Sequence, residues 1–242
     1  MSHTATNIAL LSCDVFQDEI EAYSEGSKQF AEIETLEMGL HDNPDRLRSE
    51  ITAAISRIES NPEVETILLA YGLCGNGLTG IEANRCTLVI PRAHDCISIL
   101  LGGMAPHRDQ LLKNPGTYFY SPGWIRGKRV PGPDREKHIR TLYAERFEDD
   151  EEMIDELVDA DRDAFRHYNC AAYVDITNNQ TAESYCKSCA QHQGWTYKRM
   201  NGNPAMLQDL LSGNWDPSRY LHVPPGKRIV AGDSDEVFQI EG

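Results

Sequence analysis

The chain has 242 residues, of which 40% are hydrophobic, so it is long enough to bury the core of one large domain or two small ones. Its net charge of −15, from 38 acidic and 23 basic residues, would repel a phosphate backbone and argues against nucleic acid as a partner. Its apolar runs are far shorter than the roughly 20 residues of a membrane span, and its first residues lack a secretory pattern, so we expect a cytoplasmic protein with no membrane partner.

The first half of the sequence alternates strand patterns with helical ones. Helices are predicted from Val15 to about Tyr23, from Asn43 to about Ile58 and near Ile97, with Asn43 as an N-cap and Pro44 at the first helical position. Short apolar runs predict strands at residues 7–12, 33–38, 64–71 and 87–90. This alternation predicts the α/β class, with a parallel sheet that carries helices on both faces.

An acidic block from Glu148 to Asp163 is interpreted as a solvated helix face or linker, with a docking surface as the alternative. It divides the chain into an α/β half at residues 1–143, an acidic helical connector at 144–165 and a second α/β half at 166–242. In the second half, strands are predicted at 171–176, 195–200 and 220–223, with helices at 182–192 and from residue 204.

The two halves have a similar plan. Cys13 precedes Met38 by 25 residues, and Asp175 precedes Met200 by the same 25 residues. We therefore hypothesise an internal duplication of two Rossmann-like halves. Such halves could pack within one chain or across a homodimer.

Three cysteines and one histidine follow separate predicted strands: Cys13, Cys74, His94 and Cys96. Because the carboxyl ends of parallel strands meet at one edge of a sheet, these side chains should converge in one crevice. Thiolates and neutral imidazole are the usual ligands of zinc, and sulfur-rich sites also suit iron. We expect all four to be ligands of a transition-metal ion, with zinc as the first choice and iron or an iron–sulfur cluster as the alternative. The competing interpretation is that each cysteine is a small buried core side chain.

The residues next to Cys74 and His94 in the sequence are further candidates for the site. Gly75 and Gly77 would let backbone amides approach a cofactor or an anion. Asn76 and Arg92 are the candidate catalytic groups, since substrate would meet the metal beside them and Arg92 could clamp a carboxylate or phosphate. A surface ion pair is the alternative for Arg92. Asp95 is interpreted as an N-cap for the helix that follows it, and the alternative is a hydrogen-bond acceptor for one of the neighbouring metal ligands.

The remaining cysteines have weaker patterns. Seven cysteines form an odd set in a chain without an export signal, which argues against a disulfide framework. Cys86 and Cys170 each open a predicted strand, so we expect them in the core. Cys186 and Cys189 lie inside a predicted helix, where their spacing is best explained as incidental; an iron–sulfur cluster or a second metal is the alternative.

Three motifs carry a resemblance to a known family. The segments from Tyr71 to Gly77, from Ile90 to Cys96 and from Gly116 to Trp124 closely resemble the family catalogued as domain of unknown function 1638. The resemblance implies a link to corrinoid-dependent methyl transfer, with a corrinoid or a methyltransferase as partner.

Three functions compete on these grounds. The first is a metalloenzyme, a transferase or hydrolase that acts on a small-molecule substrate by thiol or methyl or alkyl-group transfer, in which Cys13 could be a nucleophile instead of a ligand. The second is a non-catalytic carrier or accessory protein for a metal or a corrinoid. The third is an iron–sulfur protein.

Overall fold

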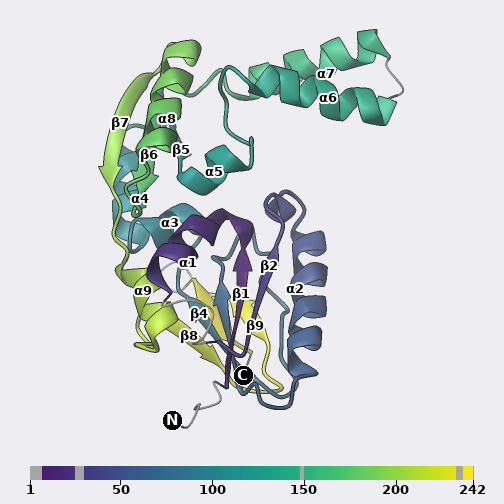
Figure 1. Cartoon of the computed structure of the whole chain (residues 1–242), viewed down its shortest axis with the longest axis vertical. Helices are drawn as coiled ribbons and strands as arrows, with labels where there is room; N and C mark the ends of the chain where they lie inside the picture. The colour runs from purple at the N-terminus through teal and green to yellow at the C-terminus, as the bar shows by residue number, and fades with distance from the viewer. Residues whose placement is uncertain (1–6, 25–29, 148–149, 233–236, 242) are drawn as a thin grey trace. The chain divides into compact units, whose positions relative to one another are not determined.

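The structure is a computed structural model, and it describes residues 7–24, 30–147, 150–232 and 237–241. It has the predicted α/β architecture, with parallel sheets flanked by helices (Figure 1). The backbone divides into two compact units, which we call unit 1 (residues 1–107 and 202–242) and unit 2 (residues 108–201). Within the described ranges, no helix has the length and apolar character that crossing a membrane requires.

Unit 1 is built on a five-stranded sheet. Its strands lie in the order β2 (Glu32–Leu36), β1 (Ile8–Cys13), β3 (Thr66–Ala70), β4 (Thr87–Pro91) and β8 (Tyr220–Val223). The first four are parallel, and β8 pairs antiparallel with β4. The chain leaves β1 towards β2 on one side and returns to β3 on the other. The strand order therefore reverses between β1 and β3, which makes this position the topological switch point of the sheet.

Helices cover both faces of this sheet. α2 (Pro44–Glu59) buries Leu47, Ile51 and Ile55 in the core that it shares with alternate residues of β1, β3 and β4. α9 (Ala205–Ser212) contacts β3 and β4, and Figure 1 shows it on the opposite side of the strands from α2. The predicted cap of α2 is confirmed, because the Asn43 side chain accepts a hydrogen bond of 3.1 Å from the Arg46 amide.

Shorter elements complete unit 1. They are the helical turns η1 (Asp14–Phe16) and η3 (Leu40–Asp42), the helices α1 (Gln17–Tyr23) and α3 (Cys96–Leu100), and the antiparallel pair β9 (Ile229–Ala231) and β10 (Phe238–Ile240). α4 (Met104–Lys113) begins in unit 1 and ends in unit 2.

Unit 2 contains a parallel sheet of β5 (Thr117–Tyr120), β6 (Cys170–Asp175) and β7 (Thr196–Asn201). α8 (Gln180–Gln193) packs on β6 and β7, and α5 (Pro122–Arg126) packs on α8. The core between them holds the fully buried side chains of Tyr120, Tyr173, Cys186 and Cys189.

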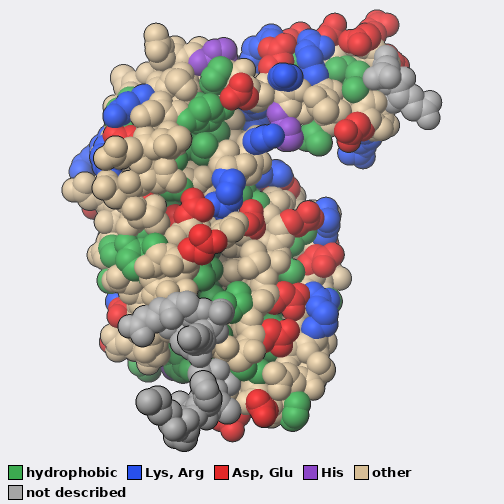
Figure 2. Space-filling view, in the orientation of Figure 1, with side chains coloured by type: hydrophobic (Ala, Val, Ile, Leu, Met, Phe, Trp, Pro, Cys, Tyr) green, Lys and Arg blue, Asp and Glu red, His purple; other side chains and the backbone are tan. Residues whose placement is uncertain are grey.

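A pair of helices, α6 (Arg135–Phe147) and α7 (Glu151–Ala164), also belongs to unit 2. The acidic block falls largely on α7, while its members Glu148 and Asp149 lie outside the described residues. Only Ile154 and Val158 of α7 are buried, and Figure 2 shows acidic and basic side chains interspersed over both helices. The described part of the acidic block is therefore a solvated helix face, as predicted.

The bounds of the two units differ from those of the predicted halves. α9 and β8 lie late in the sequence but belong to unit 1, because they pack on β3 and β4. The internal duplication stays a prediction. Cys13 of β1 pairs with Leu36 of β2, two residues before Met38, whereas Asp175 of β6 pairs with Asn201 of β7, one residue after Met200. The two 25-residue spacings therefore do not join equivalent positions of the two sheets.

Candidate functional site

The loops after β1 and β3 meet at the switch point of unit 1. Ser12 at the end of β1 is in register with Ala70 at the end of β3, which places Cys13 beside Tyr71. Cys13 and Cys74 are both half-buried, and both pack against the core on the face that α2 covers. The sequence thus brings two of its predicted metal ligands to the edge of the sheet at which open α/β folds commonly bind their ligands.

The loop after β3 is also tied to the loop after β4. The amides of Leu73 and Cys74 donate hydrogen bonds of 2.9 Å each to the carbonyls of Ala93 and His94. Gly72 allows this contact, because a Cβ there would lie 2.6 Å from the Asp95 amide nitrogen. The segments that carry Cys74 and His94 are therefore fixed side by side by their backbones.

Burial disfavours negative charge on the Cys74 thiol. Burial, and to a lesser extent the neighbouring Cys13, raise the pKa of Cys74 to about 12. The Tyr71 side chain is only 3% exposed, and its hydroxyl has no hydrogen-bond partner within the part of the chain that the structure describes. Burial, and then the charges of Cys13 and Cys74, raise the pKa of Tyr71 well above its ordinary value. The thiols of Cys13 and Cys74 thus lie close to a buried hydroxyl at the switch point of unit 1.

The backbone of the loop after Cys74 is strained. Cys74, Gly75 and Asn76 have successive φ angles of 47°, 64° and 70°, in the left-handed region. This conformation suits glycine but is unfavourable for cysteine and uncommon for most other residues. Strain of this kind costs about 1–3 kcal/mol per residue and is concentrated at functional sites. Gly77 serves packing instead, because a Cβ there would lie 2.5 Å from the Leu47 side chain.

The other two predicted ligands lie on the neighbouring loop. His94 is exposed, and its amide contacts the Met104 sulfur at 3.2 Å. Cys96 is half-buried at the first position of α3. Across the described residues, no three His, Cys, Asp or Glu side chains are arranged as a ready metal site. The four predicted ligands lie on adjacent loops without an assembled coordination sphere.

Residues 35–211 match the family described as "Protein of unknown function (DUF1638)". The chain belongs to the DUF1638 family. No curated protein and no solved structure matches it.

The DUF1638 match includes three of the four predicted ligands. Cys74, His94 and Cys96 lie inside the matched residues, whereas Cys13 precedes them. The resemblance described above is therefore confirmed for the segments from Tyr71 to Trp124.

Arg92, a candidate catalytic residue of this DUF1638 chain, holds the fold together in the structure. Its guanidinium donates hydrogen bonds of 3.1 and 2.7 Å to the carbonyls of Pro217 and Phe238. The side chain thereby links the end of β4 to two later segments of unit 1. Asn76 is exposed at the loop tip, and its carbonyl accepts a long contact of 3.4 Å from Arg48.

Asp95 is the N-cap of α3, as predicted, and accepts a 2.7 Å hydrogen bond from the Ser98 amide. The structure adds His107 to this group: its Nδ1 lies 3.3 Å from the Ser98 hydroxyl and 3.6 Å from the Asp95 carboxylate. His107 had no ligand-like spacing in the sequence. Tyr71 was part of the strand pattern, and nothing in that pattern indicated that its hydroxyl would lack a partner.

The other cysteines of this DUF1638 chain are core side chains. Cys86 is fully buried and donates to the Val64 carbonyl at 3.3 Å, and Cys170 is also buried, as predicted for both. Cys186 and Cys189 lie within α8, and burial raises the pKa of both thiols, that of Cys189 to about 11. Thiols in this state are poor nucleophiles.

Proposed function

We propose that this protein binds one transition-metal ion, zinc or iron, at the switch point of unit 1 and uses it to act on a small molecule. Cys13 and Cys74 are the first two ligands, and His94 and Cys96 complete the set from the adjacent loop. The observation that carries the proposal is the meeting of two half-buried thiols and the unpartnered Tyr71 hydroxyl at the switch point.

A cation is the group that would satisfy this site. A thiol with a pKa of about 12 stays protonated at neutral pH. Without a positive charge nearby, it therefore neither coordinates a metal ion as a thiolate nor acts as a nucleophile. A bound metal ion reverses this preference, because it is the largest local charge and deprotonates the thiols that coordinate it. The strained backbone at Cys74 is consistent with a residue that is retained for its sulfur rather than for its conformation.

A catalytic site of this kind keeps one coordination position for water or substrate. We assign the substrate to the exposed loop tip at Gly75 and Asn76, beside the exposed imidazole of His94. The reaction class that we assign is transfer of a methyl or alkyl group from a donor to a thiolate held by the metal, in which a new S–C bond would form as the bond between that carbon and its leaving group breaks. A metal ion would be needed because the Cys74 thiol is protonated at neutral pH. A metal or corrinoid carrier is the second candidate, and a site in which all four protein ligands stay bound would favour it.

Elemental analysis tests the proposal. Protein purified without oxygen or added metal is expected to contain about one zinc or iron ion per chain, and Cys96→Ser is expected to lose it. Cys86→Ser is the matched control, since that thiol lies in the same unit but is buried in the core. Wild-type protein that stays folded yet takes up neither zinc nor iron would overturn the proposal.

A further inference from the structure

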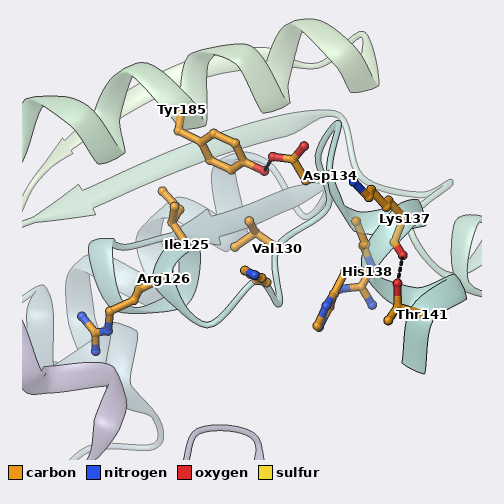
Figure 3. Close-up of a pocket in the computed structure, with 10 residues that line it drawn as sticks. Ile125, Arg126, Val130, Asp134, Lys137, His138, Thr141 and Tyr185 are labelled. Carbon is orange, nitrogen blue, oxygen red and sulfur yellow. Dashed lines mark hydrogen bonds between the residues drawn. The ribbon is translucent and has the colours of Figure 1, made fainter. Parts of the chain in front are cut away.

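Unit 2 contains a pocket of about 530 Å³ that the proposed metal site does not use. Figure 3 shows Tyr185 of α8 above Ile125 and Val130, with Lys137 and His138 of α6 to one side. The other lining residues are Arg126, Lys128, Asp134, Arg135 and Thr141. This volume falls in the ordinary range of small-molecule sites.

The lining of this pocket is basic although the chain as a whole is acidic. It contains four Lys or Arg residues and one histidine against a single carboxylate, in a chain of net charge −15. Asp134 accepts a hydrogen bond of 3.0 Å from the Tyr185 hydroxyl. Arg135 is paired with Asp161 through hydrogen bonds of 2.6 and 2.8 Å. Asp161 thus neutralises the charge of Arg135.

Two lysines remain available to a ligand. The side chains of Lys128 and Lys137 have no hydrogen-bond or ion-pair partner among the residues that the structure describes. Lys128 also has a φ angle of 55°, in the left-handed region that lysine rarely adopts. Lys128 therefore lines the pocket although its backbone has a conformation that asparagine or glycine would adopt more readily.

We propose that this pocket binds a small organic anion, a phosphate monoester or a carboxylate with an apolar portion. Lys128 and Lys137 contact the charged group, and Ile125, Val130 and Tyr185 pack against the apolar portion. A small ligand is favoured over a polyanion because the net negative charge of the chain opposes long anionic polymers, while the local cations act over a few ångströms.

Isothermal titration calorimetry with the full-length chain tests the inference, using phenyl phosphate and benzoate as probes. At least one of them is expected to bind wild-type protein, and the one that binds identifies the charged group. The double variant Lys128→Asn, Lys137→Gln is expected to bind that probe about tenfold more weakly, because both charge-assisted contacts are lost. Asparagine is used at position 128 because it tolerates a positive φ.

The matched control is Lys113→Gln, Lys227→Gln, which removes the same charge from two exposed lysines outside the pocket. It is expected to bind like wild type, and urea denaturation is expected to show that both variants are folded. The inference is overturned if neither probe binds wild-type protein at about 10 mM, or if the two double variants bind the probe equally.

Discussion

Cys74→Ser is expected to weaken zinc binding by about a hundredfold or more. Loss of a group that merely orients a metal ligand commonly costs 10–100-fold in affinity, and loss of a ligand costs at least as much. Serine has nearly the shape of cysteine, but its hydroxyl does not ionise near neutral pH, so it cannot supply the thiolate that zinc prefers. The measurement is competition for zinc between the metal-free chain and a chromophoric chelator.

The same titration has a defined pH dependence. Because the pKa of Cys74 in the metal-free fold is about 12, zinc must displace the thiol proton at every pH below that value. The zinc affinity of wild-type protein is therefore expected to rise by up to about tenfold per pH unit for each proton released, whereas Cys74→Ser should show a shallower slope. Cys86→Ser should match wild type in both affinity and slope. Equal affinities of wild type and Cys74→Ser would remove Cys74 from the ligand set.

Asp161→Ala is expected to lower the free energy of unfolding by about 2 to 3 kcal/mol. Asp161 on α7 accepts two hydrogen bonds from Arg135 on α6, and both side chains are only 18% exposed. Removing the carboxylate leaves a partly buried guanidinium without its counter-charge, which costs more than losing a surface ion pair. Urea denaturation followed by tryptophan fluorescence measures this effect, because Trp124 and Trp195 both lie in unit 2.

Asp163→Ala provides the comparison on the same helix. Asp163 lies 3.9 Å from Arg166, and both side chains are more than 70% exposed. Its loss is expected to change the free energy of unfolding by less than about 0.5 kcal/mol. Equal stabilities of the two variants would show that the Arg135–Asp161 pair contributes no more to stability than an exposed ion pair.

The parts of the fold that depend on buried apolar runs could be predicted from the sequence. β3 and β4 are almost wholly buried, and α2 has an apolar face with a clear N-cap, so their patterns were distinct. α6 was not predicted, because none of its residues is buried and its sequence has no apolar face. β5 was also missed, since Thr117–Tyr120 is a short run of aromatic residues between turns.

Only the residues that directly follow a predicted parallel strand could be assigned to the candidate site from the sequence. The position of Cys13 and Cys74 at one crevice follows from their places after parallel strands. The pairing of the loops after β3 and β4, and the unpartnered hydroxyl of Tyr71, depend on backbone conformations that no local pattern encodes. The basic pocket of unit 2 was missed for a similar reason, since its lining comes from α5, the following turn, α6 and α8.

X-ray absorption spectroscopy at the metal edge of protein purified without oxygen tests the metal site most directly. We predict a first coordination shell with at least two sulfur atoms at about 2.3 Å, the usual distance between zinc and a cysteine sulfur, and one sulfur fewer in Cys74→Ser. A shell of nitrogen and oxygen atoms alone would contradict the assignment of Cys13 and Cys74 as ligands.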